Sequence, residues 1–160
     1  MEKLCKIKPF VGQAVKKWLS DEGYHQIEMK ADKFFQYITA RKIYNDCDFE
    51  VDISNDLHGK TLHLSFFFLW PVPKEKNILC LKLLNYITAF EENAKYYLSP
   101  NRHILVCSTF HSISKPDRSL SNLLKIHSEC SMENLIDVLW AVVNGDVSKI
   151  VKPQEFNNYI

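Results

Sequence analysis

Apolar and polar residues recur along the chain with periods that predict its helices and strands. Between Val11 and Leu19 the apolar positions return at the spacing of one helix face. Gly23 suits the end of that helix. The period then falls to two in "FFQYITARKI" (34–43) and "DFEVDIS" (48–54), as expected of strands with one buried face.

A longer apolar run, "TLHLSFFFLW" (61–70), continues the strand pattern. The linker "NDLHGK" (55–60) is rich in turn-forming residues, so the run is expected to pair with the preceding strand as an antiparallel hairpin. Pro71 and Pro73 end the strand, because proline cannot donate to a sheet ladder. The run is well short of the roughly 20 residues that a spanning helix needs, so no membrane anchor is predicted.

The next segments predict a buried helix and a second hairpin. Residues 74–92 place their apolar side chains on one helical stripe. The runs "AKYYLS" (94–99) and "HILVCSTF" (103–110) flank the turn signal "PNR" (100–102), which predicts two paired strands.

A loop and a closing helix are expected after the second hairpin. The segment "SISKPDRSLSN" (112–122) is rich in serine and has a proline, which is typical of a loop. Ser131 is suited to cap a helix whose apolar positions recur over residues 132–143, and Gly145 can close it.

The order helix, three strands, helix, two strands, helix predicts the α+β class. Short turns between strands favour an antiparallel sheet, so we expect five antiparallel strands with the helices packed on one face. The chain has 160 residues, 46% apolar and 24% charged, which is ordinary for a single globular domain. A core over about residues 11–151 and a polar tail over 152–160 are expected within it.

Charge and cysteine content argue against several classes of partner. The net charge of +1 is far from the strongly basic balance that phosphate backbones select, so nucleic acid is not an expected partner. The five cysteines are widely spaced and include no C-x-x-C pair, which is typical of reduced thiols in the cytosol. Lysines interrupt every short apolar run of the N-terminus, so we expect no export signal and a cytoplasmic location.

Candidate chemistry is sparse. His103, Cys107 and His111 recur every four residues, but along the predicted strand four residues span about 13 Å, too far for one metal ion or a Cys–His pair. The acidic strand 46–52 lacks the glycine of a calcium-binding loop. The tryptophans are assigned to the core. We predict no catalytic, cofactor-binding or metal-binding residue; the alternative is a small hydrolase or thiol enzyme using Cys107 or that acidic strand.

The second face of the sheet carries the functional prediction. Alternation directs one set of strand residues toward the helices and leaves an unusually apolar set on the other side, and the members expected to bind a partner are Phe67, Leu69, Leu105 and Tyr37. Three explanations remain open. The face is covered by the tail or the serine-rich loop, it docks a protein partner or a second copy, or it lines a small-ligand pocket.

Three segments resemble the YbjN-type family of proposed bacterial sensory transduction regulators, which has a type III secretion chaperone-like fold. They are "LLNYITAF", "KYYLSPNRHILVCSTF" and "SMENLIDVLWAVV", and the resemblance extends from about Val11 to about Val151. It implies a non-enzymatic, often dimeric module that binds or regulates other proteins, with no catalytic residues to carry over. The chain departs from the pattern at residues 112–130, which replace a much shorter connection.

Together these observations predict a cytoplasmic bacterial protein-binding or regulatory module, chaperone-like in character. It is expected to use the apolar sheet face for self-association, as a homodimer, or for docking a protein. No cofactor, nucleic acid or membrane is expected, and no small-molecule substrate is identified.

Overall fold

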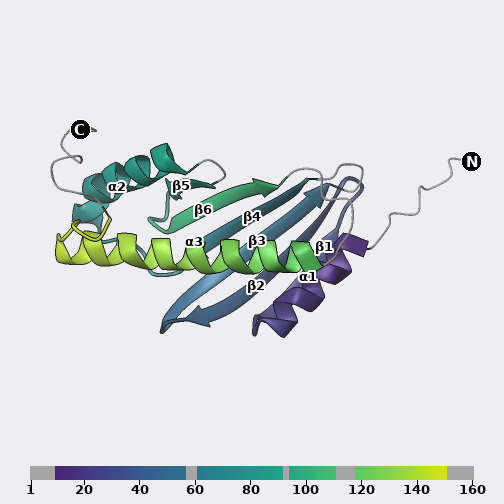
Figure 1. Ribbon diagram of the computed structural model, residues 1–160. Coiled ribbons are helices and arrows are strands. Elements are labelled where there is room, and N and C mark those ends of the chain that lie inside the picture. The colour runs from purple at the N-terminus through teal and green to yellow at the C-terminus, as the bar shows by residue number, and fades with distance from the viewer. Residues whose placement is uncertain (1–9, 57–60, 92–93, 111–117, 151–160) are drawn as a thin grey trace, which may run out of the picture.

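A computed structural model describes residues 10–56, 61–91, 94–110 and 118–150. In this part of the chain, three helices gather on one side of a six-stranded antiparallel sheet (Figure 1). The strand order is β1-β2-β3-β4-β6-β5. The elements are α1 (Phe10–Asp21), β1 (His25–Ala31), β2 (Phe35–Tyr44), β3 (Cys47–Asp56), β4 (Leu62–Phe68), the short 3-10 helix η1 (Lys74–Lys76), α2 (Asn77–Phe90), β5 (Ala94–Leu98), β6 (Ile104–Phe110) and α3 (Arg118–Asn144).

The first three strands are joined by tight turns whose residues suit their backbone. Asn45 and Asp46 join β2 to β3 with φ values of 49° and 60°, as a type I′ hairpin turn requires. Between β1 and β2 the Asp32 carboxylate accepts the N–H groups of Phe34 and Phe35 at 2.7 and 2.8 Å. These two hydrogen bonds lower the pKa of Asp32.

The core lies between the sheet and the helices. Alternate residues of β3 and β4 point into it, including Phe49, Phe66 and Phe68, whose side chains are almost fully enclosed. The buried stripe of α3 packs against this side of the sheet and contributes Leu124, Met132, Leu135, Val138 and Val142. The predicted α+β class and the direction of the alternation in β4 are therefore confirmed.

The sheet has six strands where the sequence predicts five. The additional strand, β1, has the sequence HQIEMKA, and every residue except the half-buried Ile27 is exposed. Because β1 is an edge strand that buries little on either side, it lacks the alternation that identifies the others. A bulge between His25 and Glu28, where Gln26 has φ 51°, further obscures its period.

The closing helix begins earlier than the sequence predicts. Residues 118–122 are helical rather than part of a loop, and Ser131 is buried in the middle of α3 rather than at its start. Small serines continue the buried stripe of α3, so its apolar signal is weak before Met132. The Ser128 hydroxyl donates to the Lys125 carbonyl at 2.9 Å, which satisfies it within the helix. Residues 112–117 of the predicted loop and the predicted tail 152–160 lie outside the described residues.

Candidate functional site

The face of the sheet that points away from the helices is the surface on which the sequence places the site. In Figure 1, α1 and α3 lie across the opposite face, with α2 beside β5. No helix among the described residues covers the remaining face. We refer to it as the uncovered face.

Strand register arranges the uncovered face in rows that run across the strands. The Phe67 row consists of Arg41, Glu50, Phe67, Leu105 and Tyr97. The Ser65 row, two residues further along, consists of Thr39, Asp52, Ser65, Cys107 and Lys95. The His63 row, two residues further again, consists of Tyr37, Ser54, His63 and Thr109.

Three of the four predicted docking residues lie together. Phe67 and Leu105 are direct register partners on β4 and β6, and Leu69 follows in the chain with its N–H bonded to the Asp48 carbonyl at 3.1 Å. The side chains of Phe67 and Leu69 are half-buried, while that of Leu105 lies outside the described part of the chain. Tyr37 is 42% exposed but lies in the His63 row, two strands away from Phe67 and about 13 Å from it along the strand direction.

Two further residues extend the apolar patch that the sequence identifies only in part. Ile43 is 65% exposed and pairs with Asp48 beside Leu69, while Tyr97 is 47% exposed at the far end of the Phe67 row. Both lie in alternating runs, so the period that places their neighbours in the core also assigns them to the uncovered face. We call the group the apolar band; its members are Ile43, Phe67, Leu69, Leu105 and Tyr97.

Charged residues border the apolar band on β3. The Glu50 carboxylate accepts from the Arg41 guanidinium at 3.3 Å, so the Glu50 charge has a partner within the face. Asp52 has no such cation beside it among the described contacts, and its Oδ1 is buried without a hydrogen bond. Burial first, and the Glu50 charge second, raise the pKa of Asp52. The uncovered face therefore contains a carboxylate, that of Asp52, with a buried oxygen that accepts no hydrogen bond from the described chain.

We expect replacement of Asp52 by asparagine to change how stability depends on pH. The pKa of Asp52 is higher in the folded than in the unfolded chain, so the folded state binds its proton more readily and gains stability as pH falls from 7 through the folded pKa. Asp52→Asn should be more stable than the wild type at pH 7 and should lose this gain on acidification. Thermal melts over a pH series from 7 down to about 4, on dilute protein, measure it. Glu28→Gln, a control at an exposed position of β1, should show the same dependence of melting temperature on pH as the wild type. If Asp52→Asn also shows the wild-type dependence, the raised pKa of Asp52 is contradicted.

Cys107 of the enzyme alternative lies on the uncovered face, and its thiol is hydrogen-bonded to a serine. The Cys107 Sγ lies 3.2 Å from the Ser65 Oγ, and a neutral hydroxyl cannot accept the thiol proton as a histidine would. His103 instead places its Nδ1 3.1 Å from the Phe68 carbonyl, and His111 lies outside the described residues. Within the described part of the chain no group of three or more His, Cys, Asp or Glu is placed to hold a metal ion.

A second concave surface lies on the helix side of the sheet and was not expected. It is an apolar groove of about 330 Å³ lined by Asn45, Asp46, Cys47, Trp70, Ile136, Leu139, Trp140 and Val143. The assignment of all three tryptophans to the core is wrong: Trp18 is buried, but Trp70 is 53% and Trp140 60% exposed. Helical spacing could not separate Trp140 from its buried neighbours, because the exposed side of α3 is itself partly apolar.

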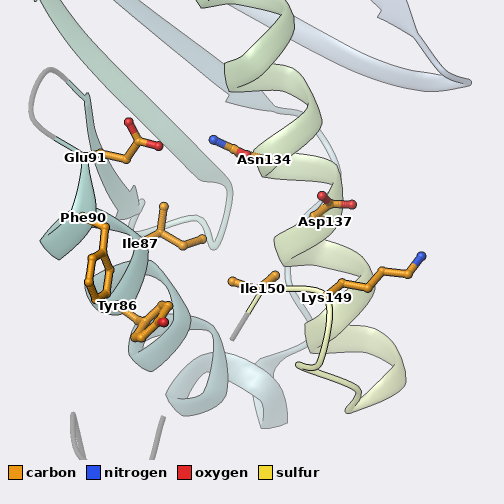
Figure 2. A pocket seen from close by; sticks show the side chains of 8 residues that line it. All are labelled: Tyr86, Ile87, Phe90, Glu91, Asn134, Asp137, Lys149 and Ile150. Atoms are coloured by element: carbon orange, nitrogen blue, oxygen red, sulfur yellow. The ribbon is translucent and has the colours of Figure 1, made fainter. Parts of the chain in front are cut away.

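The small-ligand alternative has a separate candidate hollow of about 300 Å³ between α2 and α3 (Figure 2). Part of its polar lining is already bonded within the chain or directed away from α2. Asn134 donates its Nδ2 to the Tyr96 hydroxyl at 2.8 Å, and Figure 2 shows Lys149 extending away from α2. A ligand site normally aims several polar groups at the same molecule, so this hollow supports the small-ligand explanation weakly.

Comparison with known proteins finds a likeness among solved structures. No protein-family model and no curated protein matches the chain. A solved structure, "Crystal structure of YbjN, a putative transcription regulator from E. coli", is similar at 16% identity and a TM-score of 0.48, over 88% of this chain and 95% of that one. The likeness is one of fold. It agrees with the family that the sequence resembles and carries no argument about function. No helix among the described residues is long and apolar enough to span a membrane.

Proposed function

We propose that this chain is a non-enzymatic module that binds a second copy of itself across the uncovered face of its sheet. The observation that carries the proposal is the apolar band beside two complementary charges, Asp52 and Lys95, in the neighbouring row. A regulatory role in the bacterial cytoplasm, which the sequence indicates, belongs to the same proposal.

The apolar band supplies the attraction. Large apolar side chains at the centre of an interface contribute most of its energy once water is excluded. Phe67 lies at the middle of the sheet, with the half-buried Leu69 beside it and the more exposed Ile43 and Tyr97 toward the two sides. An apolar band of this kind is seldom left wet in a free monomer.

The charge pattern favours one arrangement of two copies. A two-fold axis that runs parallel to the strands, between β4 and β6, reverses the strand order and places β3 of one copy opposite β5 of the other. Asp52 then faces Lys95 of the second copy, and Phe67 faces Leu105. An axis perpendicular to the strands would instead stack β3 on β3, with Asp48, Glu50 and Asp52 against their own copies.

Exchange of the two charges tests this arrangement. Asp52→Lys and Lys95→Asp should each weaken self-association by roughly tenfold or more, because close charge pairs across interfaces couple by about 1.5–7 kcal/mol. The double variant should return most of the lost affinity, since the pair is restored with its signs reversed. Sedimentation equilibrium measures the association constant of each variant.

The matched control is Lys16→Asp, which changes the net charge as Lys95→Asp does but lies at an exposed position of α1 on the helix side. It should associate like the wild type. A double variant no better than the weaker single variant would reject the proposed pairing, whereas association lost in Lys16→Asp would show that only net charge matters.

A further inference from the structure

The apolar groove on the helix side of the sheet is a second interaction surface, separate from the uncovered face. The Trp70 ring packs against the buried Phe68 ring with centroids 5.9 Å apart, so it points to the helix side. Across the groove, α3 presents Trp140 and the 49% exposed Val143. Two half-exposed indoles on either side of one apolar groove of about 330 Å³ leave room for a large apolar side chain between them.

The rim of the groove is acidic. Asp46 lines it from the β2–β3 turn, and no lysine or arginine is among its lining residues. The Tyr44 hydroxyl, next to that turn, donates to the Glu133 carboxylate at 2.9 Å, which ties the hairpin to α3 and fixes the negative charge there. Along α3, Glu129 lies one turn before Glu133, and residues 129–146 contain no lysine or arginine.

We propose that this groove binds a short basic segment of a partner protein, with one large apolar side chain between Trp70 and Trp140 and flanking lysines or arginines against Asp46 and Glu133. The two tryptophans can contact both parts of such a segment, because an indole ring packs against apolar side chains and its face attracts cations. The acidic rim disfavours the surface of an anionic membrane and the backbone of a nucleic acid. The site is independent of self-association through the uncovered face.

Two synthetic peptides of equal size test the proposal on the full chain. One is acetyl-KRFLRK-amide, and the other is acetyl-EEFLEE-amide, which keeps the apolar pair and reverses the charge. Tryptophan fluorescence should shift on titration with the basic peptide, and its affinity should fall as salt is raised. The acidic peptide should bind at least about tenfold more weakly.

Variants locate the site. Trp140 is exposed enough that Trp140→Ala should leave the fold intact. This variant should lower the affinity for the basic peptide about tenfold or more. Asp46→Asn combined with Glu133→Gln should lower this affinity less, and should reduce its dependence on salt. Asparagine is chosen because it tolerates the positive φ of residue 46. The matched control is Phe34→Ala, a similarly exposed aromatic residue in the β1–β2 turn, which should bind the peptide like the wild type.

Three results would overturn the proposal. Equal binding of the two peptides would show a groove that selects apolar groups without regard to charge. No binding of the basic peptide below about 1 mM would show that the groove does not take such segments. Loss of self-association in Trp140→Ala would show that the groove holds a second copy. If the chain proves monomeric but the basic peptide binds, only the proposed self-association fails.

Discussion

The Phe68→Ala variant should lose about 3–5 kcal/mol of the free energy of unfolding. Phe68 is 0% exposed, and the centroid of its ring lies 5.0 Å from that of Phe49 and 5.9 Å from that of Trp70. Truncation removes these contacts and leaves a cavity at the end of β4, where the sheet meets the helices. Urea denaturation followed by circular dichroism measures the loss, which is a large share of the roughly 5–15 kcal/mol typical of a domain.

Phe67→Ala is the matched control for Phe68→Ala. It makes the same chemical change one residue away, but on the uncovered face, where Phe67 is only half-buried. We expect a loss below about 1.5 kcal/mol, measured on protein dilute enough to be monomeric. Equal losses in the two variants would contradict the assignment of faces, because a slip of one residue in register exchanges the two sides of a strand.

The Phe67→Asp, Leu69→Asp double variant should lose self-association by at least about a hundredfold while remaining folded. Both side chains belong to the apolar band, so the change removes the apolar centre of the proposed interface. The new carboxylates also lie beside Glu50, the register partner of Phe67, and would add buried negative charge to any face-to-face pair. Circular dichroism checks the fold, and sedimentation equilibrium measures the association.

Tyr37→Asp places the same charge on the same face, outside the apolar band. Tyr37 lies on β2, which finds no strand opposite it when the axis runs between β4 and β6. The variant should therefore associate within about threefold of the wild type. Disruption equal to that of the double variant would mean that the interface is centred elsewhere on the face.

Sequence periodicity was sufficient for the parts of the fold that bury one clear face. In β4 it correctly separates Phe66 and Phe68, which point into the core, from Phe67, which points away. It fails for β1, because an edge strand exposed on both sides has no burial pattern to detect. It also misplaces the start of α3, where buried Ser128 and Ser131 continue the core stripe without an apolar signal.

The candidate sites show the same limit. Alternation places Phe67, Leu69 and Leu105 on one face, but only the strand order reveals that Tyr37 is two strands away from Phe67. The proposed pairing of Asp52 with Lys95 of a second copy depends on the position of β5 at the sheet edge. The groove between Trp70 and Trp140 joins residues from a strand end and a distant helix, and no local pattern brings them together.

The concentration dependence of the mass of the wild-type chain tests the central claim most directly. Sedimentation equilibrium over a dilution series should show a reversible transition from one copy to two, with no larger species, because a two-fold pairing of the uncovered faces is closed. A single-copy mass that persists up to about 100 μM would contradict self-association through this face.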